Sequence, residues 1–206
     1  MTALVLTALV FSLAVAYMEV QKEKRNNTPS ASGLVVSDAI GGPFNLVNQD
    51  NEPVSHETYA DRYKLIYFGF TYCPAICPTE LQKMMLAYDR LGALSEDVYP
   101  IFISVDPERD TPEVVKDYTG LFGDGLIGLT GSKDQVQDVI DVYKVYASKV
   151  REETMSDYTM DHSSFTYLMS PDNKLIGLFK IEDTANEMAG EIRRIITIHK
   201  STGRNT

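Results

Sequence analysis

The residues most able to do chemistry are the chain's two cysteines, Cys73 and Cys77, which are separated by three residues. One helical turn or a tight loop brings two side chains at this spacing to one side. Pro78 follows directly and favours the first position of a helix, so we expect Cys77 at or near the helix N-cap. Free backbone N–H groups and the helix dipole stabilise a thiolate there, and thiolates bind soft metals or attack disulfides.

The same pair also has a structural interpretation, as a disulfide bridge or as two buried cysteines packed like small apolar residues. A bridge across so short a loop removes little entropy from the unfolded chain and would stabilise the fold only weakly. We therefore favour a chemical role for the pair, with both structural alternatives left open at this point.

Strands and helices are predicted on both sides of the cysteines. The apolar run at residues 65–70 indicates a central strand covered by helices on both faces. Further strands are predicted at residues 34–36, 44–47, 99–105, 126–129, 164–169 and 175–180, the first two forming a small N-terminal hairpin. Helices are predicted at residues 78–94, at residues 112–122, and after the capping boxes Ser132/Gln135 and Thr184/Glu187. A charged, aperiodic excursion fills residues 148–161, and its length favours a functional role.

This order of elements predicts an α/β fold, a thioredoxin-like sandwich with an N-terminal hairpin. Functional sites in open α/β sheets lie beyond the carboxyl ends of the strands, which is where Cys73 and Cys77 fall. The chain carries 19 Lys and Arg against 29 Asp and Glu, a formal net charge of -10. Such an acidic chain is not expected to bind nucleic acid.

The N-terminal 18 residues are expected to lie outside this fold. Residues 2–18 are uncharged and as a helix would extend about 25 Å, near the lower limit for crossing a bilayer. We expect residues 1–18 to be a transmembrane anchor or a signal segment cut after Ala16, residues 19–33 a polar linker, and residues 34–206 the folded domain. The basic residues Lys22, Lys24 and Arg25 follow the apolar run, which by the positive-inside rule would leave the domain in the cytoplasm. We expect instead that the anchor is truncated and lacks a basic N-terminal extension.

Several motifs extend this interpretation. They are GFTYCPAICP at residues 69–78, VDPERDTP at 105–112, LTG at 129–131, DHS at 161–163, YLM at 167–169 and PD at 171–172. In this order, from about residue 42 to the C terminus, the chain resembles the Sco (SenC) family of copper chaperones for cytochrome c oxidase assembly. The resemblance implies a thioredoxin-like domain tethered by one N-terminal helix. The implied location is the bacterial inner membrane with the domain in the periplasm, or, less favoured, the mitochondrial inner membrane with the domain in the intermembrane space.

The resemblance also implies the cargo, the ligands and the partners. Cys73, Cys77 and His162 bind one copper ion, a copper donor protein supplies it, and the acceptor is the binuclear copper centre of cytochrome c oxidase subunit II. The chemistry of these residues agrees, because Cu(I) is soft and takes thiolates, and an added imidazole makes a three-coordinate site that also holds Cu(II). The sequence leaves the physiological oxidation state and the identity of the donor open.

His162 is the histidine expected in the site. It precedes the strand that, in a thioredoxin-like sheet, faces the cysteine turn. Ordinary thiol oxidoreductases of this fold resemble one another in having a cis-proline there, whereas no proline occurs between Pro112 and Pro171. His56 lies in a polar loop and His199 in the last turn of a helix, where a cation suits the dipole, so neither is expected to bind metal.

Asp106 and Asp161 are candidates for orienting the His162 imidazole or for tuning its basicity from outside the ligand set. Each also has a simple structural interpretation, Asp106 as a turn residue before a proline and Asp161 as a cap. Met155 and Met160, in the charged excursion, are less favoured candidates for a transient thioether ligand.

The leading hypothesis is therefore a metallochaperone rather than an enzyme. The alternative is a thiol-disulfide oxidoreductase that reduces the cysteines of the copper acceptor, with Cys73 and Cys77 as its redox-active disulfide. Without the cis-proline, such a protein is expected to have weak general reductase activity. A peroxidase ranks third, because nothing in the sequence marks a peroxidatic cysteine with a supporting arginine.

Overall fold

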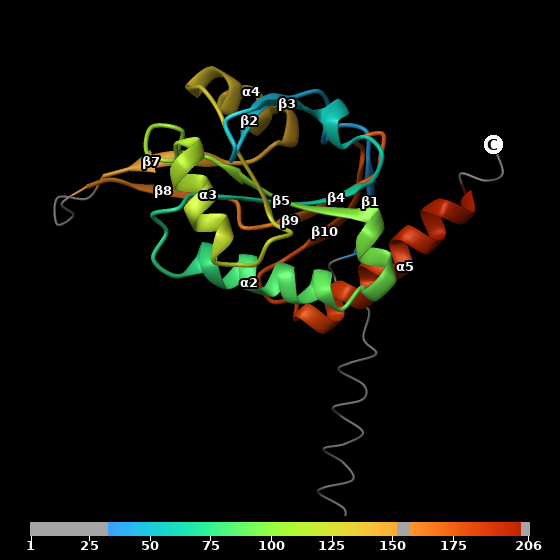
Figure 1. The fold of residues 1–206 in the computed structure, drawn as a ribbon. Coiled ribbons are helices and arrows are strands. Elements are labelled where there is room, and N and C mark those ends of the chain that lie inside the picture. The colour runs from blue at the N-terminus through green and yellow to red at the C-terminus, as the bar shows by residue number, and fades with distance from the viewer. Residues whose placement is uncertain (1–32, 152–156, 203–206) are drawn as a thin grey trace, which may run out of the picture. The chain divides into compact units, whose positions relative to one another are not determined.

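The computed structural model of the chain describes residues 33–151 and 157–202 (Figure 1). The predicted anchor at residues 1–18, the linker up to residue 32 and Met155 lie outside the described residues. Within those two ranges, no helix is both long enough and apolar enough to cross a membrane.

An eight-stranded sheet forms the centre of the described residues (Figure 1). From one edge to the other its strands are β1 (Gly33–Ser37), β10 (Leu175–Phe179), β9 (Thr166–Met169), β4 (Tyr63–Gly69), β5 (Val98–Ser104), β6 (Ile127–Thr130), β2 (Asn45–Asn48) and β3 (Pro53–Ser55). Strands β4, β5 and β6 run parallel, and β9 runs antiparallel to β4 on its other side. This arrangement confirms the predicted α/β sandwich of thioredoxin-like order.

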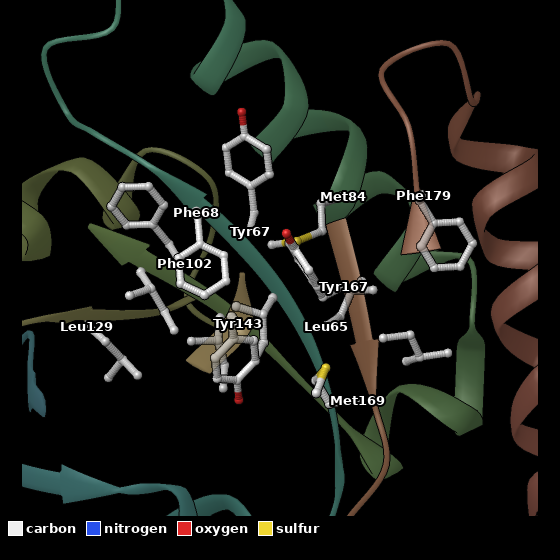
Figure 2. Packing of buried hydrophobic residues seen from close by; sticks show 14 of the residues in the cluster. Leu65, Tyr67, Phe68, Met84, Phe102, Leu129, Tyr143, Tyr167, Met169 and Phe179 are labelled. Carbon is white, nitrogen blue, oxygen red and sulfur yellow. The ribbon is translucent and has the colours of Figure 1, made fainter. Parts of the chain in front are cut away.

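Strand β4 is the buried centre of the sheet, and every one of its residues is buried. Successive side chains alternate between the two faces of a strand. Figure 2 shows Tyr67 on the same side as Met84 of helix α2 (Ile76–Asp89), and Phe68 next to Tyr143 of helix α4 (Lys133–Tyr143). The Phe68 and Tyr143 ring centroids lie 5.4 Å apart. A strand with a helix packed on each face has no polar side, which explains its continuous apolar run.

The face that carries α2 also carries α3 (Pro112–Gly120) and α5 (Ala185–Thr202), with α2 and α5 side by side (Figure 1). Helix α3 packs over β6. The helix starts follow the sequence signals: Thr111 caps α3 and accepts the backbone N–H of Val114, and Ser132 caps α4 in a capping box. The Thr184 capping box at the start of α5 is also present. These three predicted starts are confirmed.

The predicted N-terminal hairpin is wrong in its pairing. Strand β1 pairs antiparallel with β10 at the sheet edge, whereas β2 makes the hairpin with β3. Strand β3 has only three residues and continues into the 3-10 helix η1 (His56–Tyr59). So short a strand has no periodicity for a sequence pattern to detect.

The predicted helix at residues 78–94 differs at both ends. Helix α2 starts two residues earlier, at Ile76, and ends at Asp89. Gly92 then adopts φ 61, which few other residues tolerate, and a separate 3-10 helix, η2 (Gly92–Asp97), follows.

The predicted excursion at residues 148–161 contains two strands in its described part. They are β7 (Ala147–Val150) and β8 (Thr159–His162), which pair antiparallel as a two-stranded sheet separate from the main one (Figure 1). The strand expected at 164–169 starts at Thr166, so His162 belongs to β8 and not to the segment leading into β9.

Candidate metal centre

Cys73 and Cys77 lie beyond the carboxyl end of β4, in the turn that leads into α2. Both are free thiols; Cys77 is fully buried and Cys73 half-buried. The N-cap residue of α2 is Ala75, whose side chain offers no acceptor, and the Cys73 sulfur accepts the backbone N–H of Cys77 at 3.4 Å instead. The Cys73 sulfur therefore takes the place of a missing helix cap.

The two thiols differ in acidity. A hydrogen bond from the Cys77 thiol, helped by backbone N–H groups at the start of α2, lowers the pKa of Cys73 to about 5 despite its partial burial. The same hydrogen bond, followed by burial, raises the pKa of Cys77. The expectation of a thiolate at Cys77 is therefore wrong for the free site. The helix starts earlier than Pro78 predicts, and its first N–H groups act on Cys73.

His162, the last residue of β8, faces Cys77. Its Nε2 atom lies 3.3 Å from Cys77 Sγ, and its Nδ1 atom lies 3.0 Å from the carbonyl oxygen of Ser163. Because a carbonyl oxygen only accepts, Nδ1 carries a proton, and in the neutral imidazole the lone pair is then on Nε2, the atom that faces the sulfur. The rings of Tyr67 and Phe70 contact the imidazole edge-on, with centroids at 6.2 and 5.8 Å. The structure thus fixes the imidazole in the tautomer that an Nε2 metal ligand requires.

The two candidate aspartates do not orient this ring. Asp161 is exposed and adjacent to His162 in β8, so its side chain leaves the opposite face of the strand. Asp106 is buried and holds other partners. The role expected of a carboxylate falls instead to the main-chain carbonyl of Ser163.

The histidines expected to lie outside the site have other contacts. His199 in α5 lies with its Nδ1 atom 3.0 Å from the hydroxyl of Tyr63, and His56 packs edge-on against Phe44. Met160 in β8 is half-buried and lines a cavity together with Asp106.

Of the three predicted ligands, Cys77 is the one that contacts both of the others. Cys73 contacts Cys77, and Cys77 contacts His162. Within residues 33–151 and 157–202, no three His, Cys, Asp or Glu side chains form a group already placed to hold a metal ion.

Asp110 connects the cysteine turn to the sheet, and the sequence interpretation missed it. Its carboxylate accepts the backbone N–H and the hydroxyl of Thr71, at 3.0 and 2.6 Å, and the hydroxyl of Ser104 at 2.5 Å. Its carbonyl oxygen accepts the hydroxyl of Thr130 in β6 at 2.7 Å. Asp110 is 1% exposed, so these bonds form away from water. The only sequence signal was its place in the VDPERDTP motif.

Arg109 connects the β7–β8 hairpin to the same turn. Its Nε donates to Asp106 at 2.6 Å, and its Nη1 donates to the carbonyl of Tyr158 at 2.9 Å. Its guanidinium lies over the Tyr158 ring at 3.7 Å and over the Tyr72 ring at 4.8 Å. The Tyr158 hydroxyl closes the group by donating to Asp106 at 2.8 Å. Through these contacts Arg109 anchors the strand that carries His162 to the loop beside Cys73.

Replacing Arg109 by lysine is expected to loosen this hairpin while the rest of the fold stays intact. Lysine keeps the charge but loses the planar fork that bonds Asp106 and Tyr158 together. One lost charged hydrogen bond of about 1.5 kcal/mol corresponds to about tenfold faster opening. Hydrogen exchange should show about tenfold faster exchange for the amides of β8 and little change for α5.

Arg194→Lys is the matched control, because Arg194 forms an exposed pair with Glu191 on α5. We expect no change in β8 exchange in this variant. Equal exchange rates for β8 in the wild type and Arg109→Lys would show that Arg109 does not anchor the hairpin.

The sequence and the fold are both similar to those of known proteins. The SCO1/SenC family model matches residues 34–197. Protein SCO1 homolog 1, mitochondrial, of Arabidopsis thaliana is 40% identical over 190 residues, covering 88% of this chain and 57% of that protein. The crystal structure of Arabidopsis thaliana ScoI with copper bound superposes with TM-score 0.73 at 42% identity, covering 77% of this chain and 99% of that one.

The structure of Bradyrhizobium japonicum ScoI with copper bound has TM-score 0.70 at 41% identity, and the match covers 76% of this chain and 99% of that one. The chain spans only about half the length of the curated relatives that it matches, 57% and 52% for two of them. The part that the family model matches, residues 34–197, lies within the thioredoxin-like domain.

Proposed function

The chain belongs to the SCO1/SenC family, and we propose that it is a copper metallochaperone. It binds one copper ion through Cys73, Cys77 and His162 and delivers it to the binuclear copper centre of cytochrome c oxidase subunit II. A copper donor protein loads it. The ion is cargo rather than a resident cofactor, so the site must both bind it and release it.

The observation that carries this proposal is the 3.3 Å contact between Cys77 Sγ and His162 Nε2, made by residues 85 positions apart. The imidazole offers a lone pair beside a thiol, and that thiol contacts a thiolate at Cys73. Two thiolates satisfy Cu(I), and the imidazole adds a ligand that Cu(II) prefers. Two relatives that share the fold were solved with copper bound, which supports copper as the cargo.

The surroundings of Cys73 suit transfer to another protein. Tyr72 is 66% exposed and Ile76 50% exposed, so two large apolar side chains stand at the surface next to a half-buried ligand. An acceptor that covers these side chains brings its own ligands to the copper ion, which then moves by ligand exchange. Family membership supports the oxidase as acceptor, because one relative of known structure, BsSco, is described as a member of the Sco family of cytochrome c oxidase assembly proteins.

The anchor and the compartment form part of the same proposal. Residues 1–18 anchor the chain in the membrane, residues 19–33 link the anchor to the domain, and residues 34–206 form the copper-binding domain in the bacterial periplasm. The apolar composition of residues 2–18 supports the anchor.

The test is an anaerobic copper titration of the reduced full chain in detergent, beside its His162→Ala, Cys73→Ala and His56→Ala variants. We expect one copper per chain in the wild type, with a thiolate-to-Cu(II) absorption band. His162→Ala should keep Cu(I) on its two thiols but lose the Cu(II) band, and Cys73→Ala should lose tight binding of both ions. His56→Ala, the matched control, should behave like the wild type. Intact copper binding in both His162→Ala and Cys73→Ala would refute the proposal.

A second candidate function is a thiol-disulfide oxidoreductase that reduces the cysteines of the copper acceptor. The observation in its favour is the asymmetry of the pair, a half-exposed thiolate at Cys73 beside a buried thiol at Cys77. Cys73 would attack a partner disulfide, and Cys77 would then displace the partner thiol and leave a Cys73–Cys77 disulfide. This function needs no imidazole, so it predicts unchanged exchange rates in His162→Ala. An absence of stoichiometric copper binding together with retained dithiol exchange would favour it.

A further inference from the structure

The buried hydroxyl group of Tyr67 makes no hydrogen bond of ordinary geometry, and the side chains of Cys77 and Ser164 are its polar neighbours. The residue is 0% exposed, and its hydroxyl oxygen has no hydrogen-bond partner. Two other buried tyrosines do have one: the Tyr143 hydroxyl donates to Asn173 at 2.9 Å, and the Tyr63 hydroxyl lies 3.0 Å from His199 Nδ1. The Tyr118 hydroxyl also has none, but Tyr67 is the one of the two whose ring contacts the imidazole of His162. An unpaired buried hydroxyl costs free energy, so its position calls for a reason.

The hydroxyl-bearing side of Tyr67 lies against the metal centre. A Cβ atom placed on Gly69 would come within 3.1 Å of both Cys77 Sγ and Tyr67 Cε1, so the ring edge and the sulfur flank the same point. The Tyr67 ring also contacts the His162 imidazole edge-on at 6.2 Å. Figure 2 shows the ring pointing away from β4 on the side that carries α2, the helix that holds Cys77 in its first turn.

The Cys77 sulfur is the atom near Tyr67 that needs a hydrogen-bond donor when it is ionised. In the free site it is a buried thiol, and burial opposes its ionisation. When it binds a metal ion, its proton leaves to solvent and its sulfur becomes a thiolate with lone pairs to satisfy. A buried thiolate is stabilised by any hydrogen-bond donor close to it. The Phe70 backbone N–H and the Tyr67 hydroxyl are the neighbouring groups that favour its charged form.

We propose that the Tyr67 hydroxyl is a hydrogen-bond donor held for the Cys77 sulfur when that sulfur is the thiolate ligand of a bound metal ion. Tyr67 is then a positioning residue for the metal centre, acting through Cys77. The inference rests on the proposed function in one respect, that Cys77 is a ligand. It gives a role to a buried hydroxyl that makes no hydrogen bond of ordinary geometry in the metal-free protein. Hydrogen bonds to a ligand thiolate tune both affinity and reduction potential.

The test compares the full chain with Tyr67→Phe, which removes the hydroxyl alone, and with Tyr143→Phe as the matched control. Tyr143 is as deeply buried, but its hydroxyl already has an acceptor in Asn173. The probes are Cu(I), Cu(II) and Cd²⁺, a soft ion that binds thiolates whatever metal the protein carries in the cell. Affinities are measured by competition with a chelator, and unfolding of the reduced, metal-free protein is followed in urea.

We expect Tyr67→Phe to bind Cu(I) and Cd²⁺ about 10- to 100-fold more weakly than the wild type. Its thiolate-to-Cu(II) band should move to longer wavelength, because a thiolate without this donor gives up electron density more easily. Its urea midpoint should equal or exceed that of the wild type, since no bond is lost in the metal-free state. Tyr143→Phe should show the reverse pattern, with a lower urea midpoint and unchanged metal affinity.

Unchanged metal affinity and an unmoved band in Tyr67→Phe would overturn the inference, as would an equal loss of affinity in both variants. The cadmium measurement tests the role of Tyr67 independently of the proposed copper function. If the wild type binds Cd²⁺ but no copper, the copper proposal fails, and the comparison of Tyr67→Phe with the wild type on Cd²⁺ still decides the role of Tyr67.

Discussion

Replacing Asp110 by alanine is expected to lower the free energy of unfolding by about 3–5 kcal/mol, because the change leaves buried polar groups without partners. The carboxylate accepts three hydrogen bonds, two from Thr71 and one from Ser104, and the residue is 1% exposed. Water cannot replace it without opening the core. The three donors join the cysteine turn to β5, so the turn should lose its fixed position relative to α2. Urea unfolding measures the loss of stability. Copper affinity, measured under conditions where the variant remains folded, reports the loosened cysteine turn.

Asp110→Asn is the control that separates charge from shape. Burial raises the pKa of Asp110, although its three hydrogen bonds act in the opposite direction. An asparagine resembles the protonated form, so its cost should be smaller, about 1–2 kcal/mol. The acid with a raised pKa contributes stability that is complete below its ordinary pKa of 3.8 and is lost as pH rises through the folded-state value. The wild type should therefore lose stability relative to Asp110→Asn as pH rises above 3.8. An alanine variant as stable as the wild type would show that the network is dispensable.

The fold was predictable because its signals are local and repeated. The apolar run of β4, the capping residues Thr111, Ser132 and Thr184, and the alternation of strands with helices each mark an element without reference to the rest of the chain. Pairing was not predictable in the same way. Strand β1 pairs with β10, which lies near the other end of the chain. The residue pattern of each strand indicates that it is a strand but does not indicate which strand it pairs with.

The site residues were likewise predictable where their signal is local and were missed where it depends on distant contacts. Two cysteines at a fixed spacing are visible in the sequence, and His162 became visible through the motif around it. The difference in acidity between the two cysteines was not visible, because it depends on the residue at which α2 starts. A start two residues earlier moves the helix N–H groups from Cys77 to Cys73. Arg109 and Tyr67 were missed for a related reason. Each has partners far away in the chain, Tyr158 for Arg109 and Cys77 and His162 for Tyr67.

Lys64 provides the second large expected effect, on stability as a function of pH. Its side chain is 0% exposed at the centre of the sheet, and its Nζ donates to the carbonyl of Pro171 at 3.0 Å. Burial lowers its pKa from 10.5 to about 8, although the charges of Asp172 and Asp61 act in the opposite direction. Between pH 8 and pH 10.5 the unfolded chain therefore binds a proton that the folded protein has released. Because the unfolded state binds more protons in this range, stability from this group rises with pH.

The comparison that isolates this effect is the wild type against Lys64→Met, a variant with a similar apolar stem and no charge. One pKa unit corresponds to about 1.4 kcal/mol, so a fall from 10.5 to about 8 amounts to about 3 kcal/mol. Urea unfolding at a series of pH values should show the wild type gaining about 3 kcal/mol relative to Lys64→Met between pH 7.5 and pH 11, where the unfolded chain has also released its proton. Lys174→Met is the control, because the exposed Lys174 pairs with Asp38 and its pKa is raised. A lysine with a raised pKa loses its contribution as pH rises, so the wild type should not gain on this variant. A constant stability difference between the wild type and Lys64→Met across this range would mean that Lys64 keeps its proton in the folded core.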